Sequence, residues 1–358
     1  MSTVEPIRAL TGLRGLAAWW VVLYHFREAF PAGTPAVFQL LAGQGYLAVD
    51  LFFQLSGFVI ALNYARSFKE WNLPNALAFL HRRLARIYPL HIFMLTLFIL
   101  NPIAQRYFSS VGQVGDRYSL DYFILSLGLV QNWGFTDHLG WNIPAWSIST
   151  EWFAYLVFPP LVLLSLRAQR SAAAMALLAA SLLAILAGFA SFTGAGLGEA
   201  IPHFGLVRCL LQFQIGVCLY HLRAQAPADS PVNGNIAAGV AGLCFLAYAT
   251  LPLPDYSVMP LGFFCLIYAL ADPQNILARG FRMPALEWIG EISYSTYLVH
   301  YFVKDWVKFL LVRPGIPELL PLPTYLAITA VLSVVLYKWI EVPGQRAMRG
   351  WLLRKQAG

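Results

Sequence analysis

The segment TGLRGLAAWWVVLYHF (residues 11–26) decides how the chain is interpreted. It is apolar over nearly its whole length, as a membrane helix requires, yet it carries Arg14 near one end and His25 near the other. Such side chains are costly in hydrocarbon, so those that occur there commonly serve a function. We expect a retained membrane helix and not a cleaved signal peptide, because Arg14 interrupts the apolar stretch and no clear small-residue cleavage site follows.

Composition is typical of a polytopic membrane protein. Of the 358 residues, 59% are hydrophobic, 15% aromatic and only 11% charged, and the mean hydropathy of +0.62 lies outside the range of most soluble domains. The net charge of +7 does not indicate a nucleic-acid partner, because Lys and Arg form short clusters between apolar runs. The four cysteines lack metal-ligand spacing, and we expect no metal.

The apolar runs predict an all-α, polytopic transmembrane helix bundle. A helix needs about 20 residues to cross ~30 Å of hydrocarbon. About ten runs approach that length, and they start near Ala9, Tyr46, Ile87, Thr150, Ala172, Phe204, Ile236, Ser257, Glu287 and Tyr325. An eleventh run, residues 120–135, is shorter and ends in polar and aromatic residues, which favours a re-entrant or interfacial helix over a further span.

The basic clusters indicate the orientation of the bundle, because cytoplasmic loops are enriched in Lys and Arg. With ten spans and a re-entrant eleventh run, one side receives Arg8, the group Arg66, Lys69, Arg82, Arg83 and Arg86, then Arg167 and Arg170, Arg223, Arg279 and Arg282, and the C-terminal basic residues. Both termini are therefore expected in the cytoplasm. We expect one membrane domain over residues 1–358, with a core near 5–345 and a short basic tail, 346–358.

Arg14 and His25 are expected on one helix face. They are eleven residues apart, which at ~100° and ~1.5 Å per residue gives the same face and a separation of about 16 Å. Arg14 is equally well interpreted as a side chain that extends to the inner interface. A satisfied core histidine is the less favoured interpretation of His25, since an imidazole titrates near pH 6.5 and can accept or release a proton.

Two further segments place polar groups among apolar ones. In QGYLAVDLFFQLSGFVIALNYAR (44–66), Asp50 is either an interfacial residue at the outer end of a span or the partner that orients a histidine. In FLHRRLARIYPLH (79–91), helical spacing brings three guanidiniums together just before Pro89 and the predicted start of the third span. They indicate either positive-inside anchoring or a site for a phosphorylated cytoplasmic ligand.

Two later segments carry similar alternatives. In GWNIPAWSISTEWFAYLVFPP (140–160), Glu151 either lies in the capping turn of a helix or positions a hydroxyl acceptor, among tryptophans that suit a membrane interface or a sugar face. In EWIGEISYSTYLVHYFVKDW (287–306), one polar stripe must face protein or water, as a substrate path or as a contact between helices. The stripe contains Ser293, Tyr297, His300 and Lys304.

Together these segments resemble the acyltransferase-3 family of bacterial integral membrane acyltransferases. The resemblance rests on five patterns in the family's order: Arg-x10-His from Arg14 to His25, GYLAVDLFFQLSGFVIA (45–61), RRLARIYPLH (82–91), PAWSISTEWFAYLVFP (144–159) and ISYSTYLVH (292–300). It covers nearly the whole chain.

The resemblance implies acyl transfer, with acetyl expected, from cytoplasmic acyl-CoA to a hydroxyl of a carbohydrate-type acceptor in the bacterial inner membrane. An exopolysaccharide, a lipopolysaccharide or a lipid-linked sugar fits that description. The resemblance also implies that His25 is catalytic and that Arg14, Arg83 and Arg86 bind the donor. The expected site comprises His25, Asp50 and Glu151 for catalysis; Arg14, Arg82, Arg83, Arg86 and Tyr88 for the donor; and Trp146, Ser149, Tyr297 and His300 for the acceptor.

Two mechanisms and two rival classes stay open. His25 either deprotonates the acceptor hydroxyl or forms an acyl-histidine. The rival classes are a transporter or flippase for an anionic or lipid-linked substrate, which visible repeats or broken helices would favour, and an assembly or sensor protein without turnover.

Overall fold

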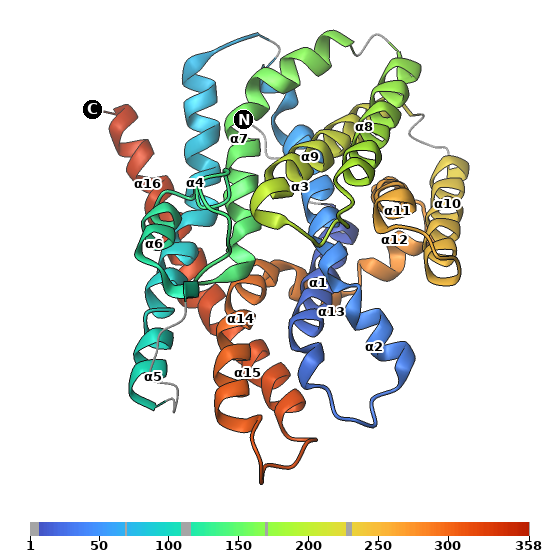
Figure 1. Ribbon diagram of the computed structural model, residues 1–358. Helices are drawn as coiled ribbons and strands as arrows, with labels where there is room; N and C mark the ends of the chain where they lie inside the picture. Colours follow the sequence, from blue (N-terminus) through green and yellow to red (C-terminus); the bar gives the residue numbers. More distant parts are fainter. Residues whose placement is uncertain (1–6, 69, 109–115, 169–170, 227–230, 358) are drawn as a thin grey trace. The chain divides into compact units, whose positions relative to one another are not determined.

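The computed structural model describes residues 7–68, 70–108, 116–168, 171–226 and 231–357 (Figure 1). Within these ranges the secondary structure is helical and contains no β-strand, which confirms the all-α prediction. Parts of the predicted basic clusters, core and tail lie outside the described residues, namely Lys69, Arg170, residues 5–6 and Gly358.

Helices form where the sequence has its long apolar runs. The ten runs correspond to α1 (Arg8–Phe26), α3 (Ala48–Tyr64), α4 (Leu73–Leu97), α7 (Trp146–Ala168), α8 (Ala172–Thr193), α9 (Ile201–Gln225), α10 (Pro231–Thr250), α11 (Asp255–Leu270), α14 (Ser293–Leu311) and α15 (Pro321–Leu336). Shorter elements connect them: η1 (Arg27–Ala29), α2 (Ala36–Gly43), η2 (Gly45–Leu47), η3 (Ala65–Phe68), α5 (Leu100–Phe108), η4 (Asp116–Tyr118), α6 (Leu120–Leu127), η5 (Ile143–Ala145), α12 (Ile276–Phe281), α13 (Pro284–Glu291), the π-helix η6 (Tyr337–Glu341) and α16 (Val342–Ala357).

Fewer helices qualify as membrane spans than the sequence predicted. Among the described residues, five segments are long and apolar enough to cross a membrane: Ala36–Phe68, Leu73–Phe108, Ala172–Thr193, Ile201–Gln225 and Pro321–Gly350. Ten spans are therefore not confirmed. Polar side chains account for part of the difference, because Arg14 and His25 in α1 and Lys304 in α14 lower the hydropathy of helices that the sequence analysis counted.

The eleventh run does not form a full span. α6 contains only eight residues, roughly 12 Å of helix, and the chain continues through turns until η5. A second expectation needs correction: the third run was expected to start near Ile87, whereas α4 begins at Leu73 and contains Pro89. The helix continues past the ring, and the Tyr294 hydroxyl donates to the Ile87 carbonyl in the same turn, 2.6 Å away.

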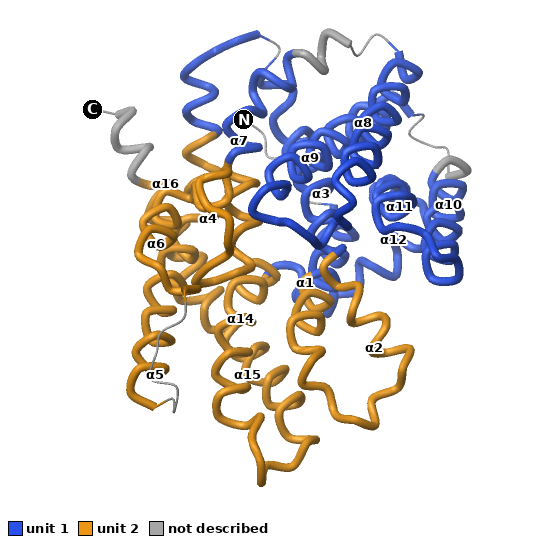
Figure 2. The backbone as a smooth tube through the Cα atoms, in the orientation of Figure 1, with its two compact units in different colours: residues 1–17, 47–79, 153–291 blue, residues 18–46, 80–152, 292–358 orange. Residues whose placement is uncertain are grey.

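The chain divides into two compact units, drawn in different colours in Figure 2. Unit 1 comprises residues 1–17, 47–79 and 153–291. Within it α3 packs along α9, and α10 packs along α11. The α3–α9 contact depends on Gly57 and Gly216, because a Cβ atom on either would collide with a backbone carbonyl of the facing helix. Small residues of this kind let membrane helices approach closely.

Unit 2 comprises residues 18–46, 80–152 and 292–358. Within it α14 and α15 lie side by side (Figure 1). The predicted polar stripe of α14 faces protein, since Ser293, Tyr297, His300 and Lys304 are all buried. A stripe of buried polar groups on one helix needs partners, and those partners form the site described next.

Candidate functional site

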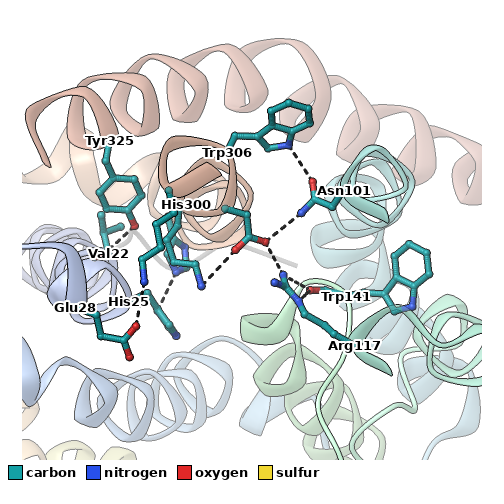
Figure 3. A network of polar contacts seen from close by, with 12 residues as sticks. Val22, His25, Glu28, Asn101, Arg117, Trp141, His300, Trp306 and Tyr325 are labelled. Atoms are coloured by element: carbon teal, nitrogen blue, oxygen red, sulfur yellow. Dashed lines mark hydrogen bonds and ion pairs between the residues drawn. The ribbon is translucent and has the colours of Figure 1, made fainter. Parts of the chain in front are cut away.

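His25 meets a second histidine within unit 2. Its Nδ1 lies 3.1 Å from His300 Nε2 in α14, and the ring centroids are 5.0 Å apart (Figure 3). The same Nδ1 lies 3.1 Å from the Val21 carbonyl oxygen, one turn earlier in α1. His300 is fully buried, and its Nδ1 lies 3.3 Å from the Thr296 carbonyl oxygen. Two helices thus hold the imidazoles in hydrogen-bonding contact.

These carbonyls assign the tautomers of a neutral pair. A carbonyl only accepts, so His300 Nδ1 carries a hydrogen that it donates to Thr296, and His300 Nε2 is an acceptor. His25 Nδ1 then carries the hydrogen that His300 Nε2 and the Val21 carbonyl share. It follows that His25 Nε2 is the unprotonated nitrogen, with a lone pair available for chemistry.

Cations surround the ring of Tyr301, which contacts His25 edge to face with centroids 5.1 Å apart. Lys304 Nζ lies 3.3 Å from the centroid of this ring, and the Arg117 guanidinium lies 4.8 Å from it. Asp305 balances both charges, because Lys304 Nζ is 3.4 Å from one carboxylate oxygen and Arg117 donates to the other at 2.7 Å. The histidine pair therefore lies in a charged, largely buried environment.

Further contacts fix this arrangement. Asn101 donates to Asp305 at 3.1 Å and accepts from the Trp306 indole at 2.9 Å. Arg117 also donates to the Trp141 carbonyl oxygen at 2.8 Å (Figure 3). The sequence did not indicate Arg117 as a site residue, because a single arginine in a connecting segment gives no pattern to detect.

The last turn of α1, which carries His25, is fastened to α14 and α15. The Tyr325 hydroxyl donates to the Val22 carbonyl oxygen at 3.0 Å, and the Tyr325 ring stacks on Phe26 with centroids 4.3 Å apart. Lys308 donates to Glu28 at 3.0 Å, just beyond the helix end. Contacts on both sides of His25 thus restrict the position of its ring.

Within the arginine segment of α4, Arg86 has a carboxylate partner that the sequence did not indicate. Arg86 forms an ion pair with Glu341, a fully buried residue of η6 that also accepts from Ser295 at 2.6 Å. Arg82 and Arg83 are partly buried on the same helix. The ion pair with Glu341 gives Arg86 a structural role. The spacing of the arginines alone did not predict this pair.

Asp50 belongs to unit 1, where both of its oxygens have partners. Arg208 of α9 makes a bidentate pair with it, at 2.8 and 2.6 Å, and Gln212 donates to it at 2.9 Å. Asp50, Arg208 and Gln212 are all buried. The sequence offered an interfacial role or a histidine-orienting role for Asp50; the structure pairs it with a buried arginine that the sequence did not indicate.

The remaining expected donor-site residues have backbone partners. Arg14, in unit 1, donates to the Gly290 carbonyl oxygen at 3.2 Å. In unit 2 the Tyr88 hydroxyl donates to the Leu127 carbonyl oxygen at 3.1 Å.

The hydroxyl groups of two expected acceptor residues, Ser149 in α7 and Tyr297 in α14, make contacts within the protein. Ser149 Oγ donates to the Leu129 carbonyl oxygen at 2.9 Å, and the Tyr297 hydroxyl lies 2.8 Å from Ser147 Oγ. Trp146 is buried, and Glu151 is partly buried on α7. Of the expected acceptor residues, the structure brings His300 to His25, whereas the hydroxyls of Ser149 and Tyr297 are engaged in packing α7.

Comparisons with known proteins agree with the sequence patterns. An acyltransferase domain family, acyltransferase-3, matches residues 7–338. Acyltransferase MdmB of Streptomyces mycarofaciens is 30% identical over 84% of this chain and 79% of its own. Peptidoglycan O-acetyltransferase OatA of Listeria monocytogenes and O-acetyltransferase OatA of Staphylococcus aureus are each 22% identical; the matches cover 94% and 96% of this chain but 55% and 58% of theirs.

This chain thus spans little more than half the length of the two OatA proteins. No solved structure matches it. The family match nevertheless extends over almost the whole sequence, from the start of α1 to η6. The chain therefore belongs to the acyltransferase-3 family and is an enzyme that transfers acyl groups.

Proposed function

We propose that this protein is a membrane O-acyltransferase that moves an acyl group, acetyl in the first instance, from acyl-CoA to a hydroxyl of a carbohydrate-type acceptor. The names of the relatives support this choice, because the Listeria OatA is a peptidoglycan O-acetyltransferase. One membrane domain in the bacterial inner membrane, with both termini in the cytoplasm, completes the proposal.

The hydrogen-bonded pair of His25 and His300 is the observation that carries it. In the proposed reaction, His25 Nε2 removes the proton of the acceptor hydroxyl while that oxygen attacks the thioester carbonyl carbon. The C–S bond then breaks and the His25 imidazolium returns the proton to the CoA thiolate. His300 Nε2 accepts the Nδ1 hydrogen of His25 throughout and stabilises the imidazolium, as the orienting member of a catalytic triad does.

This mechanism changes the roles given to the carboxylates. Asp50 was one expected partner of His25, but Arg208 neutralises its charge. His300 takes the orienting role, and Glu151 stays a candidate for holding the acceptor hydroxyl. For the donor phosphates we propose Arg14, Arg82 and Arg83, whereas the charge of Arg86 is compensated by Glu341.

The test uses purified protein in vesicles, radiolabelled acetyl-CoA and N,N′-diacetylchitobiose or crude cell-wall glycan as acceptor. We expect label to appear on the glycan with the wild type and to disappear with His25→Ala. Transfer by folded His25→Ala protein would contradict the catalytic assignment. Uptake of glycan into vesicles without label transfer would favour the transporter alternative.

A covalent route is tested in the same preparation. If His25 Nε2 itself attacks the thioester, label from acetyl-CoA stays on the protein when acceptor is omitted, and hydroxylamine releases it. Direct transfer predicts no such labelled protein. We expect direct transfer, because the hydrogen bond to His300 makes His25 a stronger base and no covalent acyl-histidine is then needed.

A further inference from the structure

A pocket of about 340 Å³ opens beside the end of α1 in unit 2. It is lined by residues of η1 and the following turn, by the end of α14 and by the segment that leads into α15. Its volume lies at the lower end of the range of about 300–1,000 Å³ that is typical of small-molecule sites. None of the residues given a role in the proposed reaction lines this pocket.

The lining combines an apolar surface with a few charged groups. Phe30, Ile316 and Pro321 contribute ring and aliphatic surface, and Glu28, Arg313 and Glu318 contribute two carboxylates and a guanidinium. Within the described residues, neither Arg313 nor Glu318 takes part in an ion pair. Carboxylates accept hydrogen bonds from hydroxyls, a guanidinium donates to ring oxygens and hydroxyls, and a phenyl ring packs on the C–H face of a sugar.

The pocket is linked to the histidine pair through short, defined contacts. Glu28 follows His25 by three residues, and its carboxylate accepts from Lys308, which follows His300 by eight residues in α14. Figure 3 shows Glu28 on the same side of the view as His25 and Val22. The pocket therefore begins at Glu28, three residues after His25, and reaches Leu311, the last residue of the helix that carries His300.

We propose that this pocket binds the polyhydroxylated ring of the acceptor and presents one of its hydroxyls to His25 Nε2. The inference rests on the proposed O-acyl transfer, which it deepens by giving the acceptor a location. The mixed lining, with both signs of charge, favours a neutral polyol over an anionic or wholly apolar acceptor. Net charge at the pocket is small, so recognition depends on hydrogen bonds and ring packing.

The first test measures binding without turnover. Ile316→Cys introduces a thiol into the lining, and Asp137→Cys, at a side chain 87% exposed outside the pocket, is the control. We expect N,N′-diacetylchitobiose to slow maleimide labelling of Ile316→Cys but not of Asp137→Cys, and cyclohexanol to slow neither. If Ile316→Cys is not monodisperse, Val312→Cys at the same pocket replaces it.

The labelling is repeated with His25→Ala added, which separates the two proposals. Protection without transfer in this background supports the pocket and the role of His25 together. If protein that retains His25 shows protection but never transfers label, the result supports the pocket and overturns the proposed function. No protection in a protein that acetylates the same sugar overturns the pocket, as does equal protection by cyclohexanol.

The second test uses steady-state kinetics. Glu318→Gln and Arg313→Gln should raise the KM for acceptor about tenfold or more, the effect of losing a hydrogen bond to a charged group. The kcat and the KM for acetyl-CoA should stay unchanged. Glu70→Gln, an exposed glutamate outside the pocket, is the matched control and should behave as wild type. A rise in the donor KM instead would contradict the assignment.

Discussion

His25 and His300 differ in burial, and the difference fits their proposed roles. His300 is fully buried and uses Nδ1 to hold its own helix backbone, whereas His25 is only partly buried and keeps Nε2 clear of the contacts that hold its ring. A base must reach its substrate, while an orienting group has to be rigid. Their separation of 275 positions in the chain means that only folding brings them together.

The pair makes a testable prediction about energetic coupling. His25→Ala should lower kcat by about 10²–10⁴-fold, the usual contribution of a general base. His300→Ala should lower kcat less, because His25 Nε2 still accepts a proton, and His300→Gln should recover part of the loss through its carbonyl oxygen. The double variant should be no worse than His25→Ala alone.

Steady-state assays of label transfer measure these effects on kcat, and the KM for acetyl-CoA serves as a control that should not change. Strict additivity of the two alanine substitutions would show that His300 acts independently of His25, and would remove its orienting role.

The pair of Asp50 and Arg208 predicts an effect on stability, whereas the histidine pair predicts an effect on kcat. Each is buried with its charge compensated by the other, so Asp50→Asn or Arg208→Gln should lower the free energy of unfolding by about 3–5 kcal/mol. Asp50→Leu combined with Arg208→Met leaves no unpaired charge and should be more stable than either single variant. Thermal unfolding in detergent measures this.

If Asp50 orients His25 instead, Asp50→Asn should lose activity while its thermal unfolding stays close to wild type. That outcome would return the carboxylate to the catalytic site.

At the scale of elements, the helices were predictable and their junctions were not. Long apolar runs give helices because a buried backbone must satisfy its own hydrogen bonds, and each of the ten runs contains one. The start of the third run was misjudged: α4 begins at Leu73 and not near Ile87, because the arginines between residues 82 and 86 lower the hydropathy of its first half. The break at Ile292, between α13 and α14, leaves no clear trace in the pattern.

Site residues were predictable to the extent that one segment contained them. His25 stood out as a titratable group in an apolar run, and His300 as part of a polar stripe. The partners of Asp50 and Arg86, which are Arg208 and Glu341, come from segments 158 and 255 positions away. Nothing local indicates such pairs, because they depend on which helices pack together.

The contact between α3 and α9 gives a prediction with a built-in control. Gly216→Ala should prevent folding, since its Cβ would collide with the Gln54 carbonyl of α3, which cannot move without breaking the helix. Gly239→Ala in α10 meets nothing within 4 Å and should be neutral or stabilising by up to about 1 kcal/mol. Yield of monodisperse protein and its unfolding temperature distinguish the two. Normal folding of Gly216→Ala would show that the two helices are not held this closely.

At the scale of the whole molecule, the distribution of basic residues predicts the sidedness of the chain. Cytoplasmic loops attract Lys and Arg, and α16 carries Arg346 and Arg349 close to the C-terminus. We expect a green fluorescent protein fused after residue 358 to fluoresce in bacterial cells, and alkaline phosphatase fused at the same point to be inactive. The same pair of fusions after Gly134, in the segment between α6 and η5, should give the reverse result, because that segment is expected on the opposite side.

Active phosphatase at the C-terminus would mean an odd number of crossings after a cytoplasmic N-terminus. It would also place the α16 end on the acceptor side, so that the donor could not reach the site from the side proposed here.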